Sequence, residues 1–325
     1  MEQITGGVTA AKGFKAASVA AGIKYKDRTD MAMIYSEVPC NVAGTFTKNI
    51  VKAAPVKWDQ KVVYETKKAQ AVVINAGIAN ACTGEEGMSY CKATAEEVEK
   101  QMQIPAEQVL VASTGVIGMQ LPIDRICAGV DAMIPELKED FESGHKAALA
   151  IMTTDTHEKE VAVQLEIGGK TVTVGGMSKG SGMIHPNMCT MLSFVTTDAA
   201  ISQPLLLEAL QADVEDTYNM ISVDGDTSTN DTCVVLANGL AGNPEITEKN
   251  ADYDAFLQAL HLVNETLAKM MAGDGEGATA LFEVKIIGAE SKEQAKILSK
   301  SVITSSLTKA AIFGHDANWG RILCA

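Results

Sequence analysis

The chain alternates short strand-like runs with two amphipathic helical patterns, and this alternation limits its fold more than any other feature. Apolar residues spaced three or four apart predict one helix over residues 204–218 and another over 256–270. Gly168 and Gly169 lie between two β-rich runs and predict a hairpin. Mixed elements without a strict βαβ rhythm predict an α+β fold of packed layers. The runs that predict strands are Met31–Glu37, Ala71–Asn75, Val109–Ser113, Val161–Ile167, Lys170–Gly176, Thr190–Thr197 and Thr232–Asn238.

Composition excludes several classes of protein. Across 325 residues, 46% are hydrophobic and 21% charged, which is enough to build a substantial core. The net charge of −14 repels phosphate backbones and anionic lipids, so we expect neither a nucleic acid nor a membrane partner. The N-terminus has no leader pattern, and the seven cysteines include no CxxC pair. A cytoplasmic location is therefore expected.

The segment KGSGMIHPNMCTML, Lys179 to Leu192, sets a hydroxyl nucleophile behind a glycine-rich approach. Thr is a weak nucleophile, but an N-terminal Thr can use its own α-amine, whose pKa is about 8, as the base. Thr190 would gain this amine if its hydroxyl attacked the Cys189 carbonyl and the Cys189–Thr190 bond broke. The alternative interpretation is a surface turn before a buried strand.

The same segment resembles the self-cleavage site of the ornithine acetyltransferase family, also called glutamate N-acetyltransferase or ArgJ. Family members have a Lys-Gly-x-Gly-Met-Ile-x-Pro-Asn-Met stretch before a small residue and the nucleophilic Thr. Here the small residue is Cys189 rather than the commoner Ala. Six further motifs have family counterparts in the same order: Asn75–Gly84, Ala112–Pro122, Met152–Thr156, Ser222–Thr232, Gly273–Thr279 and His315–Ile322.

The resemblance implies a role for five further residues. Thr114 and Gly115 correspond to the family's oxyanion-hole pair, and donors of this kind stabilise the tetrahedral intermediate of acyl transfer. Thr153, Lys179 and Glu276 correspond to substrate contacts, as Thr190 also does. A Lys cation suits a substrate carboxylate, and a Glu carboxylate suits the ammonium of ornithine. Outside the family context, Glu276 would be read as an ordinary loop acid and Thr153 as a polar helix end.

The resemblance also implies an activity. The acetyl group of N-acetylornithine would pass to Thr190 and then to glutamate, by ping-pong kinetics in arginine biosynthesis. Acetyl-CoA is a possible second donor, which the sequence does not decide. The implied fold is a layered αββα sandwich built from two fragments, residues 1–189 and 190–325, which remain intertwined and assemble with two copies of each.

No metal or organic cofactor is expected. The five histidines lack metal-ligand spacing. The run DGDTSTNDT places Asp224, Asp226, Ser228 and Asn230 at alternating positions, but it lacks the Gly and Glu that an EF-hand loop requires at its sixth and twelfth positions. We expect this run to form a turn near the cleft.

Two alternatives remain open. One is a self-processing aminopeptidase or amidohydrolase, which shares the layered architecture but typically uses an N-terminal Ser and releases the acyl group to water. The other is an unprocessed or binding-only fragment. Family members usually continue for several dozen residues beyond the Asn-Trp-Gly-Arg-Ile motif, whereas this sequence stops at Ala325.

Overall fold

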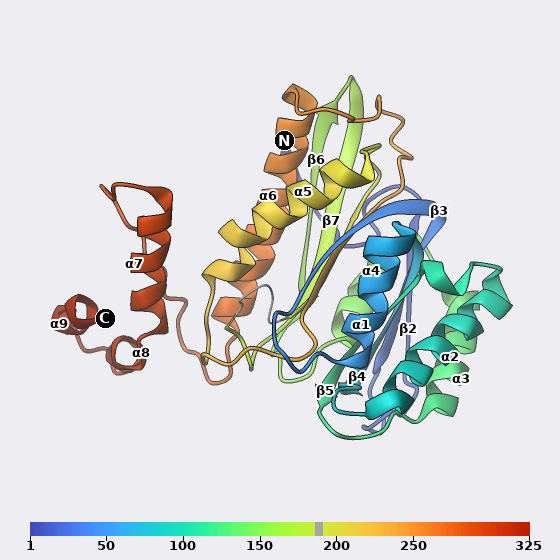
Figure 1. Ribbon diagram of the computed structural model, residues 1–325, viewed down its shortest axis with the longest axis horizontal. Coiled ribbons are helices and arrows are strands. Elements are labelled where there is room, and N and C mark those ends of the chain that lie inside the picture. Colours follow the sequence, from blue (N-terminus) through green and yellow to red (C-terminus); the bar gives the residue numbers. More distant parts are fainter. Residues whose placement is uncertain (186–190) are drawn as a thin grey trace.

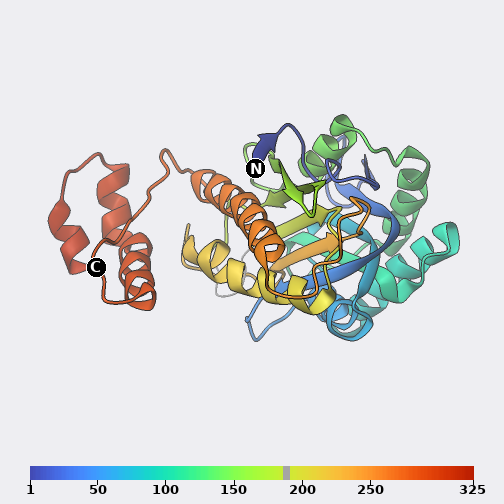
Figure 2. The same ribbon diagram turned by 90° about the horizontal axis from the view of Figure 1, so that it is seen from above.

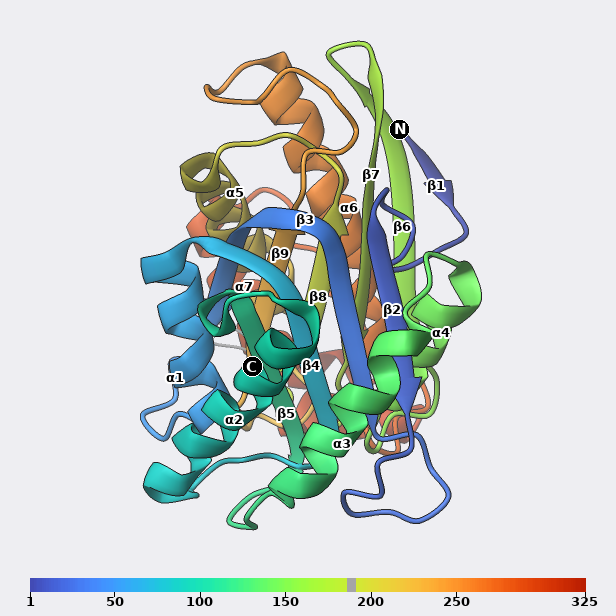
Figure 3. The same ribbon diagram turned by 90° about the vertical axis from the view of Figure 1, so that its right-hand side faces the viewer.

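A long bent strand, β3 (Met31–Phe46), is the element around which the rest of the chain is arranged. Its first half pairs with β2 on one edge and β4 on the other, while residues 41–46 pair with β9 on the edge facing away from β4. The register between β3 and β4 shifts between Tyr35 and Cys40, where the strand bends (Figure 3). The bend turns one continuous sheet into two halves that face each other. The computed structural model describes residues 1–185 and 191–325.

The sheet has nine strands in the order β1-β6-β7-β8-β9-β3-β4-β5, with β2 paired to β3 off this path. Most neighbours are antiparallel, and the predicted hairpin joins β6 to β7, with Gly168 and Gly169 at φ +56° and +74°. The two strands that follow residue 190, β8 and β9, lie side by side between β7 and β3, which both precede residue 186. The remaining strands are β1 (Glu2–Ile4), β2 (Phe14–Val19), β4 (Lys68–Ile78), β5 (Val109–Val116), β6 (Lys159–Ile167), β7 (Lys170–Lys179), β8 (Leu192–Thr197) and β9 (Thr232–Ala237).

Two strand pairs are parallel, and both have a helical crossover. Helix α2 (Gly84–Met102) connects β4 to β5, and α5 (Gln203–Asp216) connects β8 to β9. The sequence pattern did not reveal these two βαβ units. Because parallel strands end at the same edge, β4 and β5 present their carboxyl ends side by side, with Gly77 opposite Gly115.

The helices complete a four-layer αββα sandwich, as predicted. Helices α5 and α6 (Ala251–Gly273) cover the outer face of β6 to β9, and α2 and α3 (Ile123–Met133) cover the outer face of β2 to β5 (Figures 1 and 2). Between the two halves lies an apolar core that includes Phe14, Ile34 and Phe194, all with no exposed surface. This burial is the main driving force for the fold.

The other helices lie at the margins of the sandwich. Helix α4 packs on β2, and α7 to α9 stand apart from the body beyond the end of α6 (Figure 1). Lys292 and Lys296 of α7 both pair with Asp216 at the end of α5. The bounds are α1 (Ala54–Lys61), α4 (Phe141–Ala150), α7 (Lys292–Thr304), α8 (Ser306–Phe313) and α9 (Trp319–Cys324), with short helical turns at Val62–Thr66, Ala106–Gln108, Ile134–Glu136 and Tyr218–Met220.

The expected strands and helices are present in the described parts of the chain, generally with longer bounds. The helix predicted over 256–270 is the central part of α6. Of the strand predicted from Thr190, residues 192–197 form β8, and the first residue lies outside the described residues. In residues 1–185 and 191–325, no helix combines the length and the apolar character needed to cross a bilayer.

Candidate active site

A cavity of about 480 Å³ opens where the carboxyl ends of β5 and β7 meet. Its lining includes all five described residues to which the resemblance gives a role: Thr114, Gly115, Thr153, Lys179 and Glu276. They come from four separate segments of the chain. Cys189 and Thr190 lie outside the described residues, although Met191, the next residue along the chain, also lines this cavity.

The last residue of β7, Lys179, places its ammonium group at the cavity wall although it is only 7% exposed. Its Nζ donates hydrogen bonds to Thr153 Oγ1 at 2.8 Å and to Thr114 Oγ1 at 3.3 Å. Burial lowers the pKa of Lys179, and the Asp155 carboxylate, 3.9 Å from Nζ, opposes that shift. The result is a cation that is held by two hydroxyls and is suited to an anionic group in the cavity.

The carboxyl end of β5 brings Thr114 and Gly115 to the cavity. Gly115 has φ +129° and lies opposite Gly77 of β4, so closely that a Cβ at position 115 would lie 2.2 Å from the Gly77 carbonyl carbon. Only glycine fits this backbone angle and this approach. The Thr-Gly pair therefore ends its strand at a fixed point beside the Lys179 ammonium, as an oxyanion site requires.

The loop after α6 carries Glu276 to the same cavity. Its main-chain N–H donates to the Ser181 carbonyl at 3.3 Å, and its carboxylate lies against Gly182, where a Cβ would approach Oε1 to 2.4 Å. Gly182 of the KGSG segment thus leaves room for an acidic side chain. The cavity consequently has a cation and a carboxylate among its lining groups, a combination suited to an amino acid.

Asp155 was missed by the sequence reasoning, although it belongs to the MTTDT motif that carried part of the resemblance. Its Oδ1 accepts from the Gly180 N–H at 2.7 Å, and its Oδ2 accepts from the Thr153 N–H at 3.0 Å. Burial acts to raise the pKa of Asp155, but the Lys179 and Lys159 cations overcome this effect and lower it to about 2. Asp155 is therefore a carboxylate that fixes the backbone beside Lys179.

The run 224–232, for which the sequence predicts a turn near the cleft, lies at the cavity. Asp226 and residues 228–231 line the cavity. Asn230 donates from Nδ2 to the Ala79 carbonyl at 2.5 Å and to the Ser113 carbonyl at 2.8 Å. This side chain therefore ties the run to the ends of β4 and β5. The sequence contained no signal for this bond, because it joins residues more than a hundred positions apart.

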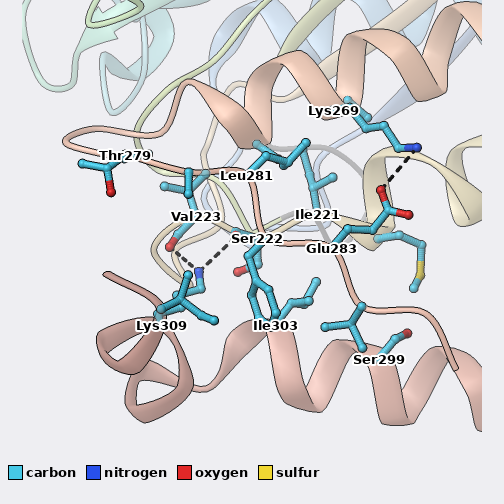
Figure 4. A pocket seen from close by; sticks show the side chains of 18 of the residues that line it. Ile221, Ser222, Val223, Lys269, Thr279, Leu281, Glu283, Ser299, Ile303 and Lys309 are labelled. Carbon is cyan, nitrogen blue, oxygen red and sulfur yellow. Dashed lines mark hydrogen bonds and ion pairs between the residues drawn. The ribbon is translucent and has the colours of Figure 1, made fainter. Parts of the chain in front are cut away.

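A second cavity of about 420 Å³ lies between α6, the segment 276–284 and the helices α7 and α8 (Figure 4). Apolar side chains such as Ile221 and Leu281 line much of it. Its labelled charged groups already have partners: Lys309 bonds to the Ser222 carbonyl at 2.9 Å, and Lys269 pairs with Glu283 at 3.4 Å. Of the predicted site residues, Glu276 alone is shared with it. We therefore assign the chemistry to the larger cavity.

The described residues contain no group of three or more His, Cys, Asp or Glu side chains that is arranged to hold a metal ion.

Comparison with known proteins identifies relatives along nearly the whole chain. A sequence model described as the ArgJ family matches residues 15–325. The arginine biosynthesis bifunctional protein ArgJ 1 of Clostridium acetobutylicum is 54% identical over 312 residues, which is 96% of this chain and 76% of that protein.

Two solved structures are similar as well. The arginine biosynthesis bifunctional protein ArgJ of Bacillus halodurans is 45% identical with a TM-score of 0.55, and the match covers 57% of this chain and 97% of that one. Ornithine acetyltransferase of Mycobacterium tuberculosis, solved as a complex with ornithine, is 42% identical with a TM-score of 0.52, and the match covers 57% of this chain and 98% of that one.

Proposed function

This chain belongs to the ArgJ family, and we propose that it moves an acetyl group from N-acetylornithine to glutamate. It is an acetyltransferase of arginine biosynthesis, like the relatives that carry those names. The observation that carries the proposal is the meeting of Thr114, Thr153 and Lys179 at one cavity, which Glu276 also lines. Both substrates are amino acids, so one set of charged contacts can orient each in turn.

In the proposed first half-reaction, the α-amine of an N-terminal Thr190 accepts the proton of the Thr190 hydroxyl. The oxygen then attacks the acetyl carbonyl of N-acetylornithine, and Thr114 and Gly115 stabilise the negative charge that forms on the carbonyl oxygen. The carbon–nitrogen bond breaks, the proton passes to the departing amine, and ornithine leaves. Thr190 is left as an acetyl ester.

In the second half-reaction, glutamate occupies the same site and its neutral amine attacks the ester carbonyl. The carbon–oxygen bond to Thr190 breaks, the amine loses a proton, and the Thr190 hydroxyl is restored. Lys179 would hold the carboxylate of either amino acid. Ping-pong kinetics are the expected consequence, because the acetyl-enzyme forms before glutamate binds.

We propose that cleavage between Cys189 and Thr190 generates the nucleophile. The lengths of the solved relatives support this proposal. Almost all of each matched chain aligns with 57% of these 325 residues, or about 185, which is close to the length of the predicted fragment 1–189. The position of β8 and β9 between β7 and β3 in one sheet would keep the two fragments together.

Two finer proposals concern the assembly and the acetyl donor. We propose an assembly with two copies of each fragment. We also propose acetyl-CoA as a second donor for the same Thr190 ester, because the relatives are named bifunctional. Neither donor requires a metal ion or an organic cofactor in this scheme.

Intact mass spectrometry of the purified protein, with and without N-acetylornithine, tests the function. We expect two fragments that separate between Cys189 and Thr190, and one acetyl group on the second fragment after incubation. Addition of glutamate should remove that group and yield N-acetylglutamate. Release of acetate without transfer to glutamate would instead indicate a hydrolase, and an uncut, unacetylated chain would refute the proposal.

A further inference from the structure

A second lysine, Lys159, lies beneath the candidate active site and has no part in the steps above. Its side chain has no exposed surface, and its Nζ lies 2.8 Å from Asp155 Oδ1 and 2.6 Å from Asp274 Oδ2. It also donates to the His157 carbonyl at 3.2 Å, so all three ammonium N–H groups have partners. We propose that Lys159 is a positioning residue that sets the two charged walls of the cavity relative to each other.

The first connection runs through Asp155 to the cationic wall. The oxygen of Asp155 that pairs with Lys159 also accepts the Gly180 N–H, the residue directly after Lys179. The other oxygen accepts the Thr153 N–H, and Thr153 is the partner of the Lys179 ammonium. A displaced Asp155 would therefore shift both the backbone and the hydroxyl that hold the Lys179 cation.

The second connection runs through Asp274 to the acidic wall. Asp274 ends α6, and its carboxylate accepts the Thr156 N–H at 3.0 Å in addition to Lys159. Its own carbonyl accepts the Ser181 hydroxyl at 2.7 Å, and the Ser181 carbonyl accepts the Glu276 N–H. Lys159 thereby fixes the start of the loop that carries the Glu276 carboxylate.

This cluster combines charge balance with a bond between distant parts of the chain. The cations Lys159 and Lys179 match the carboxylates Asp155 and Asp274, whose side chains are 0% and 3% exposed. Among the cations of residues 1–185 and 191–325, Lys159 alone pairs with both of these carboxylates. The Lys159–Asp274 bond also joins the part before residue 186 to the part after residue 190. A buried ion pair of this kind contributes geometry more than net stability.

The experiment rests on the proposed transfer reaction and compares the processed wild-type enzyme with Lys159→Met and Asp274→Asn. For both variants we expect weaker ornithine binding in calorimetry and a raised KM for N-acetylornithine, by about tenfold for Lys159→Met, with a smaller change in kcat. The matched control is Asp213→Asn, which alters a buried carboxylate bonded to His261 and Asn264 between α5 and α6. This control variant should lower Tm and leave the Kd for ornithine and the KM for N-acetylornithine unchanged.

The double variant Lys159→Met with Asp274→Asn separates positioning from stability. It restores equal numbers of buried cations and carboxylates, so we expect Tm to recover while ornithine binding stays weak. Recovery of both Tm and ornithine binding would overturn the inference. Wild-type values of the ornithine Kd and the N-acetylornithine KM in both single variants would also overturn it. If Lys159→Met does not fold, the ornithine Kd and the N-acetylornithine KM of Asp274→Asn test the inference instead. A wild-type enzyme that binds ornithine but transfers no acetyl group refutes the proposed function, and the binding data still decide the role of Lys159.

Discussion

Lys179 and Thr153 are bonded directly, with 2.8 Å between Nζ and Oγ1, although 26 residues separate them in the sequence. The bond joins the end of β7 to the segment before β6. A third residue, Thr114 at the end of β5, accepts from the same ammonium. Three motifs that are distant along the chain thus meet at the Lys179 ammonium. The first prediction concerns the loss of this charge.

Replacement of Lys179 by Met should raise the KM for both N-acetylornithine and glutamate. A charge-assisted hydrogen bond to a carboxylate contributes about 1.5 to 3 kcal/mol, so we expect a rise of about 100-fold. Steady-state kinetics with each substrate varied in turn provides the measurement. Lys170→Met, at the exposed beginning of the same strand, is the matched control and should keep wild-type constants. Unchanged KM values for Lys179→Met would remove Lys179 from the substrate site.

Gly115→Ala should abolish most activity. The new Cβ would lie 2.2 Å from the Gly77 carbonyl carbon at φ +129°, so the end of β5 must move and the proposed oxyanion donors must move with it. Loss of one such donor typically lowers kcat by about 100- to 1,000-fold. Single-turnover acetylation of the enzyme, measured by mass spectrometry, reports this step directly.

Gly118→Ala is the control for that prediction. Gly118 lies in the same motif with φ +83°, and its added Cβ would meet no atom within 4 Å. It should therefore cost about 1 kcal/mol of backbone strain and leave kcat nearly unchanged. Equal losses of kcat in the two variants would show that strain, and not the position of the oxyanion donors, explains the effect.

Two of the strands predicted from the sequence follow directly from β-branched runs on either side of a glycine turn. Val161–Ile167 and Lys170–Gly176 lie within β6 and β7, because such residues favour extended, half-buried backbone and Gly168-Gly169 supplies the turn. For helix α2 the sequence showed only a helical pattern around Cys91, because Gly87 and Thr94 interrupt the apolar face, and packing on β5 stabilises the helix instead. Local pattern could not supply that tertiary contact.

The candidate site also contains residues that the sequence indicated and residues that it did not. The motifs indicated Thr114, Gly115, Thr153, Lys179 and Glu276, and the structure brings all five to one cavity. Their supporting groups could not be found from spacing, because Lys159 and Asp274 are 115 residues apart and only the packing of α6 against β6 makes them neighbours. Resemblance identifies the groups that face the cavity, while tertiary structure is needed to see what holds them.

Glu276→Gln should distinguish the two substrates. In the proposed site, the Glu276 carboxylate would attract the side-chain ammonium of N-acetylornithine and repel the side-chain carboxylate of glutamate. Removal of the charge should therefore raise the KM for N-acetylornithine by about tenfold and leave the KM for glutamate unchanged or lower. Glu283→Gln, at an exposed position in the same segment, is the control. A rise for glutamate alone would reverse the assignment of Glu276.

Thr190→Ala should leave the chain uncut. The variant lacks the hydroxyl that is proposed to attack the Cys189 carbonyl, so denaturing electrophoresis should show one band at 34.3 kDa in place of two fragments. Thr190→Ser keeps a hydroxyl and should still be processed. Cleavage of the Thr190→Ala chain at the same bond would show that another group is the nucleophile of processing.

The low pKa of Asp155 makes part of the stability of the fold dependent on pH. Lys179 and Lys159 outweigh the effect of burial and hold this pKa at about 2 in the folded state, against 3.8 in the unfolded chain. A depressed carboxyl pKa stabilises the fold above the unfolded value, and the contribution is lost as the pH falls toward 2. The shift corresponds to about 2 kcal/mol at neutral pH.

Asp155→Asn removes the titrating carboxyl group, so comparison with the wild type measures the contribution of Asp155 to the free energy of unfolding at each pH. We expect the wild type to exceed the variant in free energy of unfolding at pH 6, and the difference to shrink by about 1 kcal/mol by pH 3, where roughly half of the Asp155 contribution is lost. Urea unfolding at pH 6, 4 and 3 provides the measurement. Asp254→Asn, which alters an exposed carboxylate at the start of α6, is the control and should show no such slope. A difference between wild type and Asp155→Asn that stays constant from pH 6 to pH 3 would show that the two lysines do not hold Asp155 in its ionised form.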